Sequence, residues 1–304
     1  MKFHIITFLI ALFLCSCSTS NKEDRNSSSS KKIIVTTGMI EDAVKAIVGD
    51  RAEVEALLGP NSDPHMAKAS KGDLRLIQSA DIIIKNGLHL EGKLGDALDE
   101  YSHSTPVYNV SDGINENDLM ETSGVHDPHI WFNIRIWRDG IAAIGNAIIK
   151  EDTANASYYE SNLKRYLNEL DQLHEYVKQQ VQVIPENKRI LITAHDAFRY
   201  FGKEYEIEVI GIQGISTLSQ TSLKRRTDLS KLIIDNEIKA IFPEASVRDN
   251  QVEALLEDCE SKGYLLKTGN TLYSDALGEK GTEAGNFIGM VKYNLKNIIE
   301  AIGI

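Results

Sequence analysis

The stretch ASYYESNLKRYLNELDQLHEYVKQQVQVI, residues 156–184, places apolar side chains at steps of three and four and contains neither glycine nor proline. The apolar positions are Leu163, Tyr166, Leu167, Leu170, Leu173, Val177 and Val181. This periodicity predicts one amphipathic α-helix. At 1.5 Å per residue, about 29 residues give a rod of roughly 43 Å, long enough to run the length of two lobes. We expect residues 151–184 to form a linking helix, although an ordinary surface helix would show the same pattern.

Short apolar runs alternate with helical patterns on both sides of this stretch. The runs before it are KIIVT (32–36), VEALL (54–58), DIIIKNG (81–87) and VYNV (107–110), and those after it are RILIT (189–193), EVIGI (208–212), IKAIF (238–242) and YLLKTG (264–269). Such alternation predicts parallel strands covered by helices. The expected fold is therefore two similar α/β lobes with parallel sheets, residues 32–150 and 185–304, joined by one long rigid α-helix.

The first residues predict an exported, lipid-anchored protein. MKFHIITFLIALFLCSC has one lysine and then an apolar run that is too short to span a bilayer, as in a secretory signal peptide, here residues 1–16. Leu14, Cys15 and Ser16 before Cys17 resemble the lipobox of bacterial lipoproteins, which makes Cys17 the expected lipidated residue. Cys15 fits this pattern less well. Residues 17–31 are polar and serine-rich, so we expect a flexible tether.

The net charge argues against one class of partner, and the cysteine content limits the disulfides that the chain can form. The net charge of −11 and the pI near 5.3 argue against nucleic-acid binding, which requires basic patches, and favour cations. Cys259 is the one cysteine after the leader, so the body of the chain forms no internal disulfide and depends on core packing.

Four potential metal ligands follow predicted strands, two from each lobe. His65 comes after VEALLGPNSDP, His129 after the loop that follows VYNV, His195 after RILITA, and Asp275 after YLLKTGNTLYS. Ligands of open α/β sheets bind beyond the carboxyl ends of the strands, so we expect the four side chains to converge in the cleft between the lobes. Three imidazoles and a carboxylate suit one divalent first-row transition metal.

The tripeptide Asp-Pro-His occurs twice, at residues 63–65 and 127–129. Proline fixes its own φ and restricts the residue before it, so each tripeptide should hold its imidazole on a stiff loop. Asp63 and Asp127 could orient the neighbouring imidazoles, or they could simply form turns. Glu244 in FPEASV is a further candidate for the cleft, although capping of the following helix is the simpler interpretation.

The remaining histidines are weaker candidates. His126 lies three residues before His129 and is the main competitor, but it lacks the proline context that His65 and His129 share. His89 in NGLHLEG also follows a predicted strand and could reach the cleft. We expect His4, His103 and His174 to be solvated.

From residue 32 onward the chain resembles the metal-binding receptors of bacterial ABC importers, the family that carries manganese, zinc or iron. The resemblance is carried by NSDPHMA, NGLHLEG, HDPHIWFN, TAHDAFRYFGKEY, IQGISTLSQ, FPEASV and LYSDALG, in this order. It implies two α/β lobes joined by a long helix, with a metal ion held between them by His65, His129, His195 and Asp275. It also implies a membrane permease as partner.

The segment before the second ligand bears on the identity of the metal. Zinc receptors of this family commonly carry a long loop there that is rich in histidine and acidic residues. SDGINENDLMETSGVHD (111–127) is short and has one histidine, which resembles the manganese or mixed manganese/zinc branch. We therefore expect Mn²⁺ as cargo. Zn²⁺ comes next, because sites with nitrogen ligands generally bind zinc more tightly than manganese, and Fe²⁺ is a third option.

The sequence therefore favours a monomeric, exported metal receptor that is not an enzyme. The alternatives are a zinc-dependent hydrolase and a surface adhesin. Four protein ligands argue against the hydrolase, because catalytic zinc usually keeps three protein ligands and a water.

Overall fold

The computed structural model describes residues 30–122, 124–218, 221–248 and 250–302. The expected signal peptide, residues 1–16, the expected lipidation site, Cys17, and most of the expected tether lie outside the described residues. Within the described ranges, no helix combines the length and apolar character that a membrane span needs.

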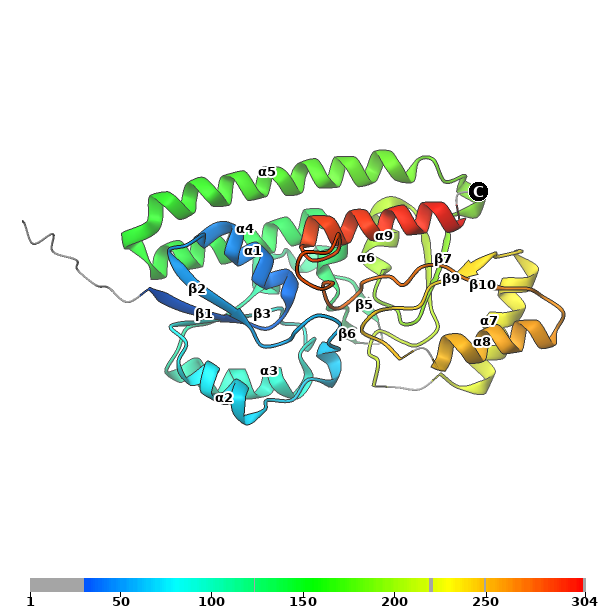
Figure 1. The fold of residues 1–304 in the computed structure, drawn as a ribbon, viewed down its shortest axis with the longest axis horizontal. Coiled ribbons are helices and arrows are strands. Elements are labelled where there is room, and N and C mark those ends of the chain that lie inside the picture. Colours follow the sequence, from blue (N-terminus) through cyan, green and yellow to red (C-terminus); the bar gives the residue numbers. More distant parts are fainter. Residues whose placement is uncertain (1–29, 123, 219–220, 249, 303–304) are drawn as a thin grey trace, which may run out of the picture.

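The first lobe is a parallel four-stranded sheet with helices on both faces (Figure 1). Its strands, in the order β2-β1-β3-β4, are β1 (Lys31–Val35), β2 (Ala52–Ala56), β3 (Ile82–Lys85) and β4 (Val107–Asn109). Helices α1 (Gly38–Val48) and α4 (Ile134–Glu151) cover one face, and α2 (Lys71–Gln78) and α3 (Gly92–Asp99) cover the other. Ile82 and Ile84 face the first pair and Ile83 faces the second, which explains a run of isoleucine without polar alternation.

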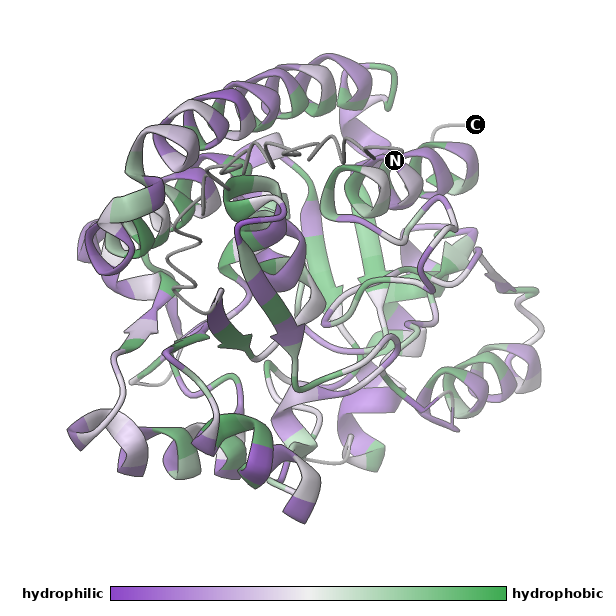
Figure 2. Cartoon of the chain, turned by 60° about the vertical axis from the view of Figure 1, so that its left-hand side comes forward, coloured by the Kyte–Doolittle hydropathy of each residue, from purple (hydrophilic) through white to green (hydrophobic). Residues whose placement is uncertain are grey.

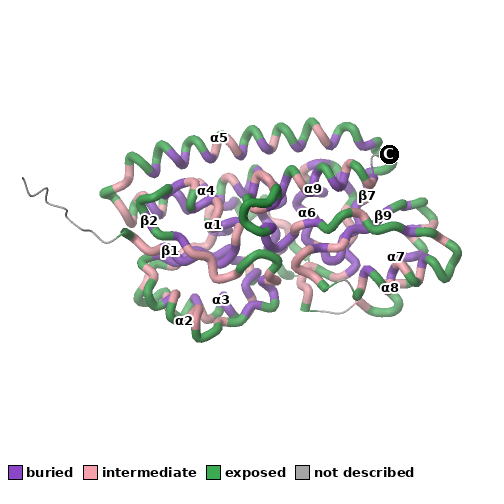
Figure 3. Tube along the Cα trace, viewed as in Figure 1, coloured by how far each residue is buried: buried purple, intermediate pink, exposed green. Residues whose placement is uncertain are grey.

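The predicted long helix is α5 (Ala156–Val181), which crosses the top of both lobes (Figure 1). The prediction was residues 151–184, but α4 ends at Glu151 and a short 3₁₀ turn (Thr153–Asn155) precedes α5. The buried side chains of α5 recur at steps of three and four, as predicted, and form a stripe along its inner side (Figure 3). Amphipathic packing against both lobes therefore maintains this helix.

The second lobe has a smaller parallel sheet. Its strands are β7 (Ile190–Thr193), β8 (Glu208–Gly211), β9 (Ala240–Ile241) and β10 (Lys267–Thr268). The pairs β7-β8 and β9-β10 are joined by a bridge between Thr193 and Phe242, which gives the order β8-β7-β9-β10. The helices are α6 (Arg199–Tyr205), α7 (Leu223–Asp235), α8 (Asn250–Ser261) and α9 (Phe287–Ile302). A small antiparallel hairpin, β5 (Glu121–Thr122) and β6 (Val125–His126), follows β4.

One hydrophobic core crosses from the first lobe into the second. It contains the inner faces of α1, α4 and α5 together with α6 and α9. The rings of Trp137 and Phe287 lie 5.6 Å apart, and those of Phe132 and Phe198 lie 4.2 Å apart. Figure 2 shows the hydrophobic strands in the middle of the molecule, between helices with hydrophilic outer surfaces. A separate, smaller core fills the space between β7, β9, α7 and α8.

Candidate metal centre

The four predicted ligands lie together at the boundary between the lobes. His65 is in a 3₁₀ turn (Pro64–Met66) after β2, and His129 follows the hairpin β5-β6. His195 comes two residues after β7, and Asp275 follows β10. One nitrogen or oxygen from each residue lies within 4.8 Å of the corresponding atoms of the other three. The predicted convergence at strand ends is present, although His129 is separated from β4 by the hairpin.

The spacing of the imidazole nitrogens matches that of ligands around a single ion. His129 Nε2 lies 3.3 Å from His65 Nε2 and 3.3 Å from His195 Nε2. Two nitrogens bound to one zinc ion at about 2.0–2.1 Å in tetrahedral geometry are separated by about 3.4 Å. All three imidazoles are buried, so a metal ion held here would be removed from solvent.

Asp275 contributes negative charge and two oxygens. Its Oδ2 lies 3.3 Å from His195 Nε2 and 3.9 Å from His65 Nε2, and its Oδ1 lies 3.5 Å from His129 Nε2. Oδ1 is buried and has no hydrogen-bond partner in the described structure. A buried carboxylate oxygen without a partner is costly, and a cation between the imidazoles would satisfy it.

Two of the imidazoles are held by carboxylates on the side away from the centre. His129 Nδ1 lies 2.7 Å from Asp127 Oδ1, and His195 Nδ1 lies 2.6 Å from Glu244 Oε2. The same carboxylates also accept backbone N–H groups from the same two histidines, at 3.0 and 2.8 Å. A carboxylate at Nδ1 fixes the tautomer that leaves Nε2 free to bind a metal. Glu244 thus contacts His195, where helix capping seemed the simpler interpretation.

Asp63 plays a different part from Asp127. Its Oδ1 accepts the backbone N–H of His65 at 2.9 Å, which closes the turn, and its Oδ2 accepts the hydroxyl of Thr217 at 2.6 Å. The turn-forming interpretation of Asp-Pro-His therefore applies to Asp63. In the second tripeptide, Asp127 both forms the turn and contacts the imidazole.

Burial and neighbouring charges give the predicted ligands different proton affinities. Burial lowers the pKa of His65 to about 3, against the opposing effect of Asp275. Burial also opposes charge on His195, but Asp275 and Glu244 beside it raise the pKa of this imidazole well above its usual value. For Asp275, burial is outweighed by the three histidines, and its pKa falls below the usual value.

The other described histidines lie outside this group of four. His126 is half-buried on β6, and His89 is exposed, with a φ of +59°. His103 is exposed, as predicted. The expectation that His174 is solvated is wrong, because its Nδ1 lies 3.1 Å from the Tyr205 hydroxyl and its ring packs against that of Tyr205. His4 lies outside the described residues.

The motif NGLHLEG supports the site through residues that the sequence did not single out. Asn86 Nδ2 donates to the carbonyl of Pro128 at 2.9 Å, immediately before His129. Glu91 Oε1 accepts from the backbone N–H of Asn86 at 2.6 Å and from the Thr36 hydroxyl at 2.8 Å. Asn86, Glu91 and Thr36 are all buried. The sequence predicted only His89 of this motif as a candidate for the cleft, because an asparagine or a glutamate in a loop has no local signature.

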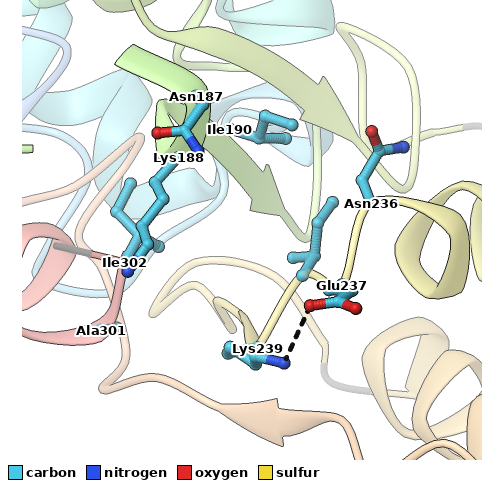
Figure 4. Close-up of a pocket in the computed structure, with 9 residues that line it drawn as sticks. Asn187, Lys188, Ile190, Asn236, Glu237, Lys239, Ala301 and Ile302 are labelled. Carbon is cyan, nitrogen blue, oxygen red and sulfur yellow. Dashed lines mark ion pairs between the residues drawn. The ribbon is translucent and has the colours of Figure 1, made fainter. Parts of the chain in front are cut away.

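A surface pocket lies at the opposite end of β7 from His195 (Figure 4). Its lining includes Asn187, Lys188, Ile190, Asn236, Glu237, Ile238, Lys239, Ala301 and Ile302. Lys239 and Glu237 form an ion pair at 4.0 Å, and both are largely exposed. The pocket has no histidine and shares no residue with the group of four, so we do not connect it with metal binding.

Known proteins with a similar sequence and fold are named for metal binding. The manganese-binding lipoprotein MntA of Bacillus subtilis is 36% identical over 296 residues, 97% of each chain. The zinc-binding protein TroA of Treponema pallidum is 36% identical over 274 residues, 90% of this chain and 89% of TroA. The solved structure of periplasmic TroA superposes with a TM-score of 0.88 at 35% identity, covering 90% of this chain and 99% of TroA. These relatives are named as metal-binding proteins and not as enzymes. Residues 33–301 match the family described as "ZnuA: Zinc-uptake complex component A periplasmic", and the chain belongs to this family.

Proposed function

We propose that the protein is an extracytoplasmic receptor that captures one divalent transition-metal ion and delivers it to the permease of an ABC transporter. The ligands are His65, His129, His195 and Asp275. The observation that carries the proposal is the meeting of four buried donor groups from both lobes, one of them a carboxylate oxygen without another partner. Buried polar groups of this kind need a partner, and a metal ion supplies one to all four.

Manganese is the proposed physiological cargo, with zinc next. Both oxygens of Asp275 face imidazole nitrogens, so the site offers up to five donor atoms. Zinc in protein sites is usually four-coordinate, whereas manganese accepts carboxylate oxygens and higher coordination. Relatives of equal identity are named for each of the two metals. Fe²⁺ would suit the same donors as the third option.

The proposed setting is the outer face of a bacterial membrane, to which a lipid on Cys17 anchors the chain as a monomer. The proposed partner is the membrane permease, since relatives in Streptococcus are named as substrate-binding lipoproteins of manganese ABC transporters. The net charge of −11 supports cation capture and gives no basis for binding nucleic acid.

We also propose that the protein catalyses no reaction. A zinc hydrolase needs a coordination position for water and a nearby general base. Here the carboxylates nearest the centre already have roles: Asp127 and Glu244 hold imidazoles, and Asp275 faces the three nitrogens. No described feature specifically favours adhesion.

Elemental analysis of protein purified without added metal, followed by competition between Mn²⁺ and Zn²⁺, tests the receptor function. We expect one ion per chain, lost in His195→Ala, and no hydrolysis of ester, peptide or phosphate substrates. Metal-dependent hydrolysis that His195→Ala abolishes would overturn the proposal. In a deletion strain we expect impaired metal uptake with normal attachment, and the opposite result would favour an adhesin.

A further inference from the structure

His65 is the ligand that lies nearest the surface. Its side chain keeps 4% of its exposure, whereas those of His129, His195 and Asp275 keep none. His65 also lines a surface pocket, together with Met66, Lys68, His89, Lys93 and Leu218, among others. A metal ion that enters or leaves the site on this side has to pass His65. A shift of the His65 loop should therefore change the rate at which the ion leaves the site.

Within the first lobe, backbone contacts fix the loop from two sides. Asp63 Oδ1 accepts the backbone N–H of His65, and Gly92 lies directly against the carbonyl of His65. A Cβ at position 92 would stand 2.8 Å from that carbonyl oxygen, and Gly92 has a φ of +48°. These contacts set the shape of the loop, but they do not involve the second lobe.

The second oxygen of Asp63 reaches across the cleft. Asp63 Oδ2 accepts the hydroxyl of Thr217, which belongs to the second lobe, at 2.6 Å. Thr217 lies in residues 212–218, which follow β8 and are tied to the His195 turn. In those ties, Gln213 N donates to the carbonyl of Ala194 at 3.0 Å, and Asp196 N donates to the carbonyl of Gly214 at 3.2 Å. One carboxylate thus connects the loop of His65 to the segment that packs against the loop of His195.

We propose that Thr217 is a positioning residue that holds the His65 loop in place through Asp63 and thereby sets the rate of metal release. The inference rests on the proposed receptor function. Thr217 lies outside the group of four ligands, so its effect comes from keeping the two lobes in contact at the exposed side of the site.

The test uses the full chain loaded with Zn²⁺ and measures release into excess chelator by stopped-flow. Thr217→Val removes the hydroxyl while keeping the branched shape, and Thr217→Ser restores the hydroxyl. We expect release about tenfold faster for Thr217→Val, and within about twofold of wild type for Thr217→Ser, because hydrogen bonds to carboxylates are among the stronger ones. Thr221→Val is the matched control, because the Thr221 hydroxyl donates to Ile212 within the second lobe, and it should release at the wild-type rate.

The thermal unfolding of the protein treated with chelator should be the same in wild type and Thr217→Val, which separates positioning from a general loss of stability. The inference would be overturned if Thr217→Val released the ion at the same rate as wild type. It would also be overturned if Thr217→Val and Thr221→Val accelerated release equally. Both results would leave the receptor function intact. Failure of the wild-type protein to bind any ion would instead overturn the receptor function.

Discussion

At the scale of single residues, the imidazoles of His129 and His195 each lie between two carboxylates. His195 has Glu244 at Nδ1 and Asp275 at Nε2, and His129 has Asp127 at Nδ1 and Asp275 at Nε2. In the proposed site, the outer carboxylate fixes the ring and the inner one would bind the same ion as the ring. Substitution of an outer carboxylate should therefore weaken metal binding without removing a ligand.

Glu244→Gln tests this division of roles. The amide keeps an oxygen for the backbone N–H of His195 but loses the charge that stabilises the imidazole. We expect metal affinity to fall about 10- to 100-fold, as is typical for partners of metal-bound histidines. Competition with a chromophoric chelator measures the change, and Glu253→Gln, at an exposed position on α8, is the control. Equal affinities in Glu244→Gln and wild type would show that Glu244 only supports the backbone.

The raised pKa of His195 makes metal binding depend on pH. A metal ion binds the neutral imidazole, so binding expels a proton wherever the pH lies below this pKa. His65, with a pKa of about 3, stays neutral over the same range and adds no pH dependence there. We expect affinity to fall as pH drops and to keep rising above pH 6.5, the usual histidine value, because His195 still holds its proton there.

Calorimetry in buffers of different ionisation enthalpy measures the released protons directly. Below the pKa of His195 we expect close to one proton per ion. An affinity that stays constant from pH 7.5 to 5 would contradict a site built on this histidine.

At the scale of elements, the site depends on where strands end. The apolar runs predicted the strands, and their carboxyl ends predicted that the four ligands would meet. The strands of the second lobe are shorter than their runs, and β10 covers only Lys267–Thr268 of YLLKTG. In this run the residues before Lys267 lie outside the strand. A pattern of hydrophobic residues does not report where backbone pairing begins.

The supporting contacts could not be predicted in the same way. Glu244 is 49 residues from His195, and Asn86 is 42 residues from Pro128. Each pair meets only because of the order in which strands lie in their sheets. The sequence motifs contain these residues, but the spatial arrangement of the strands determines which side chain contacts each imidazole.

Helix α5 should contribute strongly to stability through its buried stripe. Leu170 is fully buried, and Leu167 on the same helix is only half-buried. Leu170→Ala should lower the free energy of unfolding by about 2–5 kcal/mol, because it leaves a cavity in the core that both lobes share. Urea denaturation measures the loss, and Leu167→Ala should cost clearly less. Equal losses would mean that α5 does not pack as described.

At the scale of the whole molecule, the shared core limits how far the lobes can move apart. On the side of α5 and α9, side chains from both lobes form one continuous cluster, and Trp131 Nε1 donates to the carbonyl of Ser274 at 3.0 Å. The smaller core of β7, β9, α7 and α8 is separate. Release of the ion should therefore involve local shifts on the side of His65 and this smaller core.

Small-angle X-ray scattering tests the extent of this movement. We expect the scattering curves of the metal-loaded and chelator-treated protein to be nearly superimposable, because opening the shared core would expose many buried apolar side chains. A clear increase in the radius of gyration after chelation would show a hinge movement of whole lobes. Such an increase would contradict the role of the shared core.

Anomalous diffraction from crystals grown with Mn²⁺ or Zn²⁺ tests the central claim most directly. We expect one strong peak per chain, bonded at once to the Nε2 atoms of His65, His129 and His195 and to the carboxylate of Asp275, with metal–nitrogen distances of about 2.0–2.1 Å for zinc. A peak at any other set of residues, or a bound ion that leaves His195 or Asp275 uncoordinated, would contradict the account.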